Sequence, residues 1–326
     1  MKFVESSFNY EPQQPGNIGM YKMIEKAARI CYKTEDLITE DSYDKIINKI
    51  LIPKGHTSPL EFGTCYLFRS FNLSKISQEE IDWIEKYEND RYTRVEEITV
   101  GEELSVYITT TFRTILQGDY KNPIEAIKNK FNKDWKDDLK YWSEPTEFHH
   151  KRYCYKFVMD RIGSQSVERH RGNFGISFAQ ESTRYINYNR DKFEHEITIC
   201  LPSKFYQLID EWSESTDSLT GESYSWLKDA SIKDKINFLR THSRDWVAYE
   251  DCLKNSEHEY MYLVGEEKWK PEEARDVLPT CIKTEFMMCA YPEDWEMFLF
   301  RRTDSHAHPQ IQRITKELEK DFRSRL

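Results

Sequence analysis

One short stretch, ERHRGNFGISFAQESTRY at residues 168–185, combines cations with short polar side chains. Arg169, His170 and Arg171 lie in a row, and Arg184 follows a loop that is rich in serine, alanine, glutamine and threonine. Paired arginines clamp phosphate through bidentate hydrogen bonds, and hydroxyl and loop N–H groups can complete such a site. An isolated Arg-His-Arg is more often a solvated charged surface, but a loop of short side chains is suited to wrapping a ligand. The stretch therefore predicts a site for a phosphate-bearing ligand.

The charge of the whole chain narrows the class of ligand. The 326 residues carry a formal net charge of −10. General nucleic-acid binders and membrane-surface binders usually carry a basic excess, and the chain has no stripe of interleaved aromatic and basic residues. A nucleic-acid-binding module that uses Arg-His-Arg and the nearby tyrosines is the less favoured alternative. A local basic cluster in an acidic chain indicates instead one small anionic ligand.

The hydropathy and the cysteines indicate a cytoplasmic protein. No run of about 18 apolar residues is present and the N-terminus shows no signal-peptide core, so we expect neither a membrane span nor secretion. The cysteines are odd in number, scattered and without a C-x-x-C pair, which is typical of reduced thiols rather than of a disulfide framework or a zinc ribbon. They are Cys31, Cys65, Cys154, Cys200, Cys252, Cys281 and Cys289.

Several known active-site signatures are missing. The glycines form neither G-x-G-x-x-G nor G-x-x-x-x-G-K-[ST], and neither G-x-S-x-G nor H-E-x-x-H occurs. Asp304, His306 and His308 could hold a metal, but no further ligand is clustered with them, and a polar start of a helix is the favoured interpretation. His149 and His150 receive the same interpretation. We therefore predict no metal site.

The N-terminal part of the chain predicts two helices, a turn and a strand. Residues 16–32 place apolar side chains at the spacing of a half-buried helix, and residues 42–52 repeat the pattern until Pro53 stops it. HTSPLEF at 56–62 is predicted as a turn. GTCYLFRSF at 63–71 is rich in aromatic and other strand-forming residues, which indicates a strand.

A polar segment, residues 74–148, follows this strand. It contains helical fragments such as PIEAIKNKFNKDW at 123–135 and one strand-like stretch, SVYITTTFRTIL at 105–116. A strand is predicted again at 153–160, YCYKFVMD. We interpret residues 74–148 as an insertion between two strands of one sheet, so that residues 1–326 form a single domain.

The C-terminal part of the chain is more regular. Its predicted elements are a surface loop, a short helix, a strand and a longer helix, at 213–223, 270–279, 282–291 and 292–302. On the longer helix, Trp295, Phe298, Leu299 and Arg302 fall on one stripe. A cation that ends a core-facing stripe needs a partner, because an unpaired buried charge is very costly. Arg302 is therefore expected to point at a carboxylate or at a ligand.

Taken together, the motifs resemble the signature of the flavin-dependent thymidylate synthases. That signature joins Arg-His-Arg to a serine-rich loop ending in Ser-x-Arg-Tyr, and adds His-x-Ser/Thr-Pro-x-Glu, Ala-Arg-x-x-Leu-Pro and a closing pair of helices. Here the segments read RHR, SFAQESTRY, HTSPLEF, ARDVLP and DWEMFLFRRTDSHAHPQI, at 169–171, 177–185, 56–62, 274–279 and 294–311. The resemblance covers roughly residues 18–68 and 150–320, and several motifs in the right order are far more specific than one.

The sequence departs from the family pattern at a few positions. Ten residues separate Arg171 from Ser182 where the family usually has seven, and Ser166 stands where glutamine or glutamate is usual. Ala-Gln at 179–180 replaces the common Asn-Glu, and AYPED at 290–294 replaces an Asn-Ala-Arg that contacts the flavin in many members. The altered loop leaves a sister activity open, either hydroxymethylation of dUMP or modification of another pyrimidine nucleotide.

The resemblance implies an enzyme that methylates dUMP to dTMP, with methylenetetrahydrofolate as carbon donor and a reduced FAD that NADPH recharges. The flavin then carries the chemistry, which agrees with the absence of a Pro-Cys-His-like nucleophile segment around Cys200 or Cys281. The implied fold is α+β, a central sheet with packed helices on one face. The implied assembly is a homotetramer whose sites are shared between subunits.

The resemblance also implies roles for individual residues. Arg275 is expected to reach the phosphate of dUMP, and Arg302 to hydrogen-bond the uracil edge. Ser182 is the second catalytic candidate, with a binding and polarising role, because a serine nucleophile needs a general base and none is evident nearby. The flavin contacts are expected at Ser58, Arg169, His170, Arg171 and Gln180. The dUMP contacts are expected at Ser166, Arg169, Gln180, Glu181, Ser182, Thr183, Arg184, Arg275 and Arg302.

Overall fold

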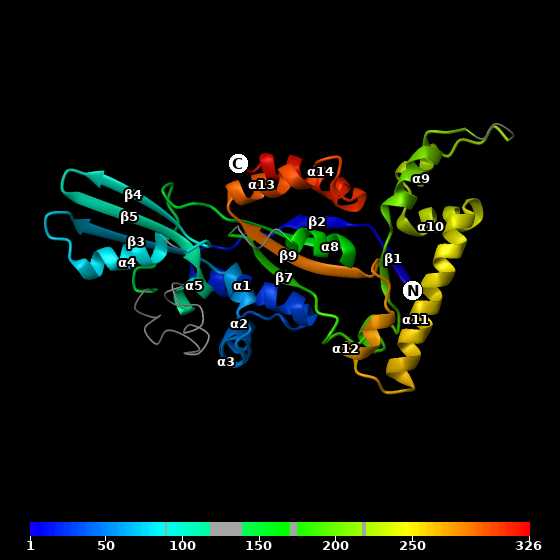
Figure 1. Ribbon diagram of the computed structural model, residues 1–326, viewed down its shortest axis with the longest axis horizontal. Coiled ribbons are helices and arrows are strands. Elements are labelled where there is room, and N and C mark those ends of the chain that lie inside the picture. The colour runs from blue at the N-terminus through cyan, green and yellow to red at the C-terminus, as the bar shows by residue number, and fades with distance from the viewer. Residues whose placement is uncertain (89, 118–138, 170–174, 217–219) are drawn as a thin grey trace.

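The computed structural model describes residues 1–88, 90–117, 139–169, 175–216 and 220–326. Its elements form three groups along the long axis of the molecule (Figure 1). A three-stranded sheet lies at one end, a four-stranded sheet lies in the middle, and a group of helices lies at the other end. Antiparallel sheets with packed helices define the α+β class, so the predicted fold class is confirmed.

The four-stranded sheet at the centre is antiparallel, in the order β2-β6-β9-β7. Its strands are β2 (Ser7–Tyr10), β6 (Tyr153–Asp160), β7 (Ser177–Gln180) and β9 (Lys283–Ala290). β6 and β9 pair along their full length, from Tyr153 opposite Ala290 to Asp160 opposite Lys283. The strands predicted at 153–160 and 282–291 are thus confirmed.

Helices cover both faces of the central sheet. One face packs on α8 (Arg161–Glu168), α13 (Pro292–Arg302) and α14 (Pro309–Arg323). The other face packs on α1 (Gly16–Tyr32), which confirms the helix predicted at 16–32. The expectation of helices on one face is wrong. β6 and β9 carry almost continuous runs of apolar residues, and such runs are typical of strands that are buried on both faces.

The three-stranded sheet is built mainly by the polar segment. Its strands are β3 (Thr64–Asn72), β4 (Arg94–Val100) and β5 (Glu103–Thr111), in the order β3-β5-β4, with α4 (Gln78–Glu88) packed against them. The prediction that the strands on either side of 74–148 share one sheet is wrong, because β3 pairs with β5 and β6 pairs with β2 and β9. The polar segment therefore supplies the partners of β3.

Two further predictions inside this region need correction. The stretch 105–116 is a strand only as far as Thr111, where β5 ends and α5 (Phe112–Gln117) begins. The helical fragment predicted at 123–135 lies outside the described residues.

The second predicted helix is present but irregular. Its parts are α2 (Ser42–Ile46), a π-helical turn η2 (Ile47–Leu51) and α3 (Ile52–Lys54). Pro53 lies inside the last turn and does not end the helix. The end comes at Gly55, whose φ of 69° is in the left-handed region that glycine adopts without steric cost. The predicted turn at 56–62 contains the 3₁₀-helix η3 (Ser58–Phe62).

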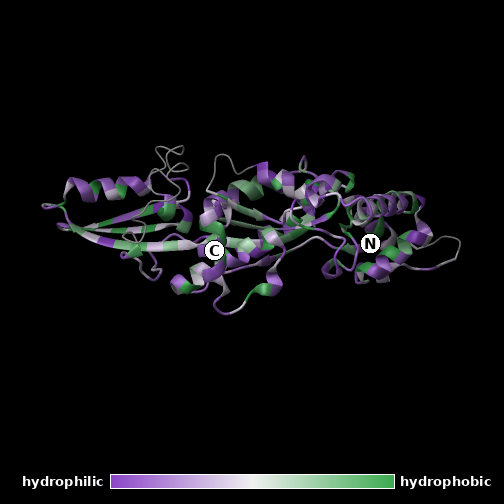
Figure 2. Ribbon diagram, turned by 90° about the horizontal axis from the view of Figure 1, so that it is seen from below, coloured by the Kyte–Doolittle hydropathy of each residue, from purple (hydrophilic) through white to green (hydrophobic). Residues whose placement is uncertain are grey.

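The third group contains a short parallel pair of strands and a layer of helices. Its elements are β1 (Lys2–Val4), β8 (Thr198–Cys200), α9 (Ser203–Ser213), α10 (Ile232–His242), α11 (Arg244–Gly265), α12 (Pro271–Ala274) and the 3₁₀-helix η7 (Arg275–Val277). Hydrophilic and hydrophobic colours alternate along these helices (Figure 2), as expected when one face of a helix packs on a core. Within the described ranges, no helix has the length and apolar character needed to cross a membrane.

Candidate active site

Arg302 ends α13, on the stripe that the sequence predicts. Trp295, Phe298 and Leu299 of this stripe are fully buried, and Arg302 is half-buried beside α8, where its Nη2 donates to the Ser166 carbonyl. Burial lowers the pKa of Arg302, and the neighbouring cations lower it further. Its Nε is buried without a hydrogen-bond partner, and no carboxylate in the described ranges pairs with it. A buried donor without a partner costs about 1–3 kcal/mol, so this guanidinium is poised for a ligand atom.

Helix α8 positions several of the candidate residues. Asp160 is its N-cap and accepts a hydrogen bond from the Gly163 N–H. The N–H groups of Arg161 and Ile162 donate to carbonyls just before β9, at 3.2 and 3.3 Å. α8 is therefore fixed to the beginning of β9. Its first turn carries Arg161, and its last turn carries Ser166 and Arg169 toward Arg302.

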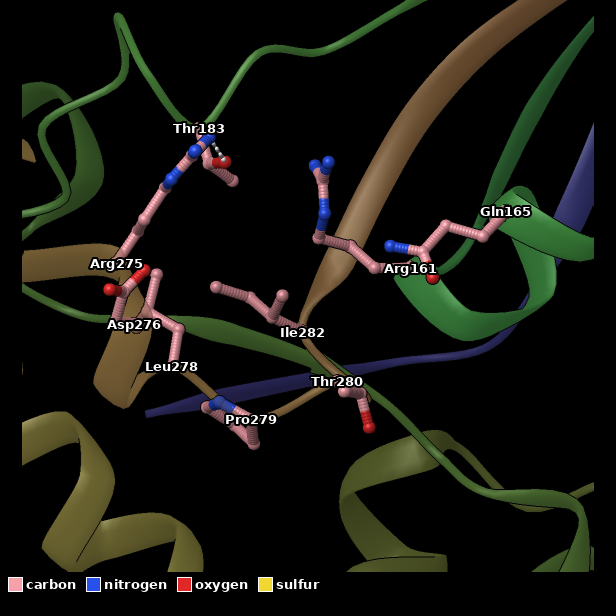
Figure 3. A pocket seen from close by; sticks show the side chains of 9 residues that line it. All are labelled: Arg161, Gln165, Thr183, Arg275, Asp276, Leu278, Pro279, Thr280 and Ile282. Atoms are coloured by element: carbon pink, nitrogen blue, oxygen red, sulfur yellow. Dashed lines mark hydrogen bonds between the residues drawn. The ribbon is translucent and has the colours of Figure 1, made fainter. Parts of the chain in front are cut away.

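A cavity of about 340 Å³ lies between α8, the loop after β7, and the segment from η7 to β9. It is lined by Arg161, Gln165, Thr183, Arg275, Asp276, Leu278, Pro279, Thr280 and Ile282 (Figure 3). Arg275 Nη1 donates to Thr183 Oγ1 at 3.3 Å, and Arg161 Nη1 donates to the Glu181 carbonyl at 3.3 Å. Within the part of the chain that the structure describes, neither arginine forms an ion pair with a carboxylate. The cavity thus presents two cations that lack anionic partners.

Two further predicted residues, Gln180 and Ser182, lie at the end of β7 and in the loop that follows it. Gln180 Nε2 donates to Ser164 Oγ at 2.5 Å and to Thr284 Oγ1 at 3.3 Å. Ser182 is held by its backbone N–H, which donates to the carbonyl at the end of α1, and its Oγ accepts from the Arg184 N–H at 3.4 Å. No carboxylate or imidazole among the described residues hydrogen-bonds to Ser182 Oγ. The geometry therefore provides no general base for a serine nucleophile.

Two other predicted substrate residues do not line the cavity. Arg184 is exposed and pairs with Glu272 at 3.4 Å. The Glu181 carboxylate is 2% exposed; it accepts hydrogen bonds from the Tyr188 hydroxyl and the Glu285 N–H, and Lys283 Nζ lies 3.2 Å from it. Glu181 therefore fixes the base of the loop through its side chain.

Glu181 belongs to a larger buried network of charges. Lys33, at the C-terminal end of α1, lies 2.5 Å from Glu285 and 3.9 Å from Glu181. Lys156 and Lys283 lie 2.6 Å from Glu285. Burial opposes ionisation of Glu285, but the lysines lower its pKa far below the usual range. The network ties α1, β6 and β9 to the start of the loop that carries Ser182.

The predicted flavin contacts are divided between the two faces of the central sheet. Ser58 begins η3, and Phe62 of the same element packs with α1. Arg169 ends α8, whose Val167 packs on the opposite face with α13 and α14. His170 and Arg171 lie outside the described residues. Gln180, the third described candidate, hydrogen-bonds to Ser164 of α8 and so lies on the side of Arg169.

The segment AYPED at 290–294 joins the two larger sheets. Tyr291 is fully buried, and its hydroxyl donates to the carbonyls of Tyr92 and Thr109, at 2.9 and 2.8 Å. Glu293 pairs with Arg94 at 2.5 Å. The Tyr291 contacts are internal, whereas the Glu293 side chain is about half exposed (53%).

The histidines considered as metal ligands have other partners. His306 bonds to Asp304, and His308 caps α14 by accepting from the Gln310 N–H at 3.3 Å. The polar start of a helix predicted for His308 is thus confirmed. His149 is buried against the Leu67 carbonyl. The described residues contain no group of three or more potential metal ligands.

Four polar residues of the cavity were not predicted from the sequence, namely Asp276, Thr280, Arg161 and Gln165. Arg161 and Gln165 both lie on α8, which was not predicted as a helix. The available signal was Asp160, since an aspartate directly after a strand and before a polar run is typical of a helix N-cap. The network around Glu181 was missed as well, because its members are far apart in the sequence.

Comparison with known proteins identifies the family. A family model described as "Thymidylate synthase complementing protein" matches residues 97–326, which include every residue that lines the cavity. The HTSPLEF segment precedes the matched residues. No curated protein sequence gives a significant match.

Two solved structures are similar at low levels. A UMP/dUMP methylase PolB from Streptomyces cacaoi, bound with 5-Br dUMP, is 13% identical over 99% of this chain and 92% of that chain, with a TM-score of 0.37. Thymidylate Synthase X (ThyX) from Helicobacter pylori, with FAD and dUMP, is 12% identical over 96% and 90%, with a TM-score of 0.32. These likenesses are too weak to carry an argument about the site. The family match covers well over half of the chain, and this protein therefore belongs to the thymidylate synthase complementing protein family, the flavin-dependent thymidylate synthases.

Proposed function

We propose that the chain methylates dUMP to dTMP, with methylenetetrahydrofolate as carbon donor, FAD as cofactor and NADPH as reductant. The observation that carries the proposal is the cavity with Arg161 and Arg275, two cations without carboxylate partners in a chain of net charge −10. Nine other arginines of the described ranges pair with a carboxylate. An unpaired cation in a cavity is stabilised by a bound anion. The phosphate of a nucleotide supplies that anion.

The rest of the nucleotide is proposed to lie along α8. Arg302 contacts Ser166, which is five residues after Arg161 and therefore roughly 7.5 Å along the helix axis. We assign Arg275 and Thr183 to the phosphate and the unpartnered Nε of Arg302 to the uracil edge. A guanidinium at that edge would favour the ionised form of the base. Ser182 and Gln180 contribute polar groups between these ends.

FAD, when bound, supplies the hydride that completes the methyl group. The donor chemistry of Ser58, Arg169 and Gln180 fits a flavin with its pyrophosphate, since they offer hydroxyl, guanidinium and amide groups. Ser58 and Arg169 belong to elements that pack on opposite faces of the central sheet. This division supports a site that is shared between subunits, as in the proposed homotetramer.

A direct test of the proposal is the colour of the purified protein. We expect yellow protein with flavin absorption, from which denaturation releases FAD, and we expect turnover of dUMP to dTMP when methylenetetrahydrofolate and NADPH are added. No G-x-G-x-x-G segment is present to hold a dinucleotide. The binding of FAD would therefore depend on the Arg-His-Arg segment at 169–171. A colourless protein that takes up no added FAD would rule the proposal out.

A second prediction is that neither Cys200 nor Cys281 is needed for turnover. Burial raises the pKa of both thiols, so neither is a ready nucleophile at neutral pH. Cys200→Ala and Cys281→Ala should form dTMP at rates within a few-fold of the unmodified protein, apart from any loss of stability. The rates are measured at matched flavin content, with circular dichroism as the folding control. Loss of turnover in a well-folded single variant would instead indicate thiol catalysis.

We also propose a cytoplasmic location. All seven cysteines are free thiols, which supports this proposal.

One observation favours a related activity as the second candidate. Tyr291 is buried in internal contacts and Glu293 pairs with Arg94, in the segment where many members of the family carry an Asn-Ala-Arg that contacts the flavin. Such a change fits a flavin-dependent hydroxymethylation of dUMP or the modification of another pyrimidine nucleotide. The mass of the product, measured with dUMP and with other pyrimidine nucleotides as substrates, separates these activities from dTMP formation.

A further inference from the structure

We propose that Arg161 is a phosphate ligand, and that Arg161 and Arg275 together select a substrate with a dianionic terminal phosphate. This inference rests on the proposed function, which it deepens by assigning a residue that the family resemblance does not. Both guanidinium groups line the same cavity, and Figure 3 shows the Arg161 side chain pointing into it.

The backbone of α8 cannot provide this anion site by itself. A helix N-terminus often binds phosphate through its free N–H groups. Here the N–H groups of Arg161, Ile162 and Gly163 already donate to the carbonyls of Ile282 and Thr280 and to Asp160 Oδ1. These three N–H groups are therefore not free for an anion in the cavity, and we assign its hydrogen bonds to the arginine side chains.

The two arginines are held so that they converge. Arg161 donates to the Glu181 carbonyl and Arg275 donates to Thr183 Oγ1, so each is tethered to one end of the same three-residue loop. Each tether uses one Nη group, and further N–H groups of the planar fork remain for a ligand. The Glu181 carboxylate, which could have neutralised Arg161, is occupied on the far side of the loop by Lys283.

The two guanidinium groups, rather than the net charge of the cavity lining, favour a doubly charged ligand. The lining carries Arg161, Arg275 and one carboxylate, that of Asp276. Two guanidinium groups facing one cavity repel each other until an anion lies between them. A phosphate monoester has its second pKa near about 6 and is a dianion at neutral pH, so it can accept from both forks at once. A nucleoside without phosphate gains nothing from either arginine.

The test compares binding of three probes, dUMP, deoxyuridine and inorganic phosphate, by isothermal titration calorimetry. For Arg161→Ala we expect dUMP and inorganic phosphate to bind about ten- to hundredfold more weakly at pH 7.5, because one charge-assisted hydrogen bond is lost. Deoxyuridine should bind unchanged. At pH 5, where the phosphate is mainly a monoanion, the difference between the unmodified protein and the variant should shrink.

Matched variants test whether weaker binding by Arg161→Ala comes only from a lost charge or from a loss of folding. Arg244→Ala removes an exposed arginine from the start of α11 and should leave all three affinities unchanged. Asp276→Asn removes the carboxylate of the lining and should tighten phosphate binding or leave it unchanged. Arg161→Lys keeps a cation but not the fork, so its affinities should fall between those of the unmodified protein and Arg161→Ala. Thermal unfolding is recorded for each variant, and Arg161→Gln replaces Arg161→Ala if the latter does not fold.

The outcomes separate this inference from the proposed function. If Arg161→Ala binds dUMP as the unmodified protein does, or weakens deoxyuridine as strongly as dUMP, Arg161 is not a phosphate ligand, although dTMP formation can still occur. If the unmodified protein makes no dTMP but shows the expected pattern with inorganic phosphate, the two-arginine site stands and the proposed reaction does not.

Discussion

Replacing the buried Glu181 by alanine is expected to lower the free energy of unfolding by about 3 kcal/mol or more. The change removes one of the two carboxylate partners of Lys283, at 3.2 Å, and leaves the Glu285 N–H and the Tyr188 hydroxyl without their acceptor. Burial by itself lowers the pKa of Lys33, and the carboxylates of Glu181 and Glu285 raise it above its usual value. The lysines would thus lose part of the charge that stabilises them inside the protein.

The measurement is the urea midpoint of unfolding at constant slope. Glu296→Ala is the matched control, because Glu296 also pairs with a cation, Arg323, but the two side chains are 42% and 51% exposed. An exposed pair contributes about 0–1 kcal/mol, so the control should unfold near the midpoint of the unmodified protein. Equal midpoints for Glu181→Ala and Glu296→Ala would show that the buried network adds nothing to stability.

Replacing Arg302 by alanine is expected to weaken dUMP binding or turnover roughly ten- to hundredfold, through loss of a charge-assisted hydrogen bond of about 1.5–3 kcal/mol. FAD content should remain, because the residues assigned to the flavin are others. Arg302→Lys should rescue turnover poorly, since an ammonium group cannot reproduce the planar fork. The comparison uses flavin-loaded protein, with dUMP titrations and initial rates for the unmodified protein and both variants.

The lysine variant also separates a ligand role from a structural one. Arg302 donates to the Ser166 carbonyl, and a lysine can still make that single bond to α8. If the arginine acts only by holding α8, Arg302→Lys should recover both stability and turnover. We expect it to recover the melting temperature alone. Normal turnover of dUMP by Arg302→Ala would show that the proposed orientation of the nucleotide is wrong.

Local patterns allowed many elements to be predicted from the sequence. The helices at 16–32 and 292–302 and the strand at 153–160 are confirmed because each depends on its own apolar spacing and on flanking signals. The sheet partner of β3 could not be predicted in this way. Pairing is set by contacts between distant segments, and the apolar strands on both sides of the polar segment were equally plausible partners.

The residues of the site also differ in whether local sequence patterns could predict them. Thr183 and Arg275 were expected at the nucleotide from their motifs, and the structure brings them within 3.3 Å of each other at the cavity. Arg161 carries no motif, and its place depends on how α8 attaches to β9. The role of Glu181 in the charge network could not be predicted from local sequence either, because the network includes Lys33 and Glu285, which are 252 residues apart.

The attachment of α8 to the beginning of β9 has a consequence for how fast a ligand binds. The backbone on both sides of the cavity is already in place, since Arg161 N–H donates to Ile282 and Leu278 N–H donates to Arg275. Ordering on binding is then limited to the arginine side chains, at about 0.5–1.5 kcal/mol each. Because no segment of this lining has to rearrange, the association rate should follow diffusion and charge attraction, and should fall as salt screens the two cations.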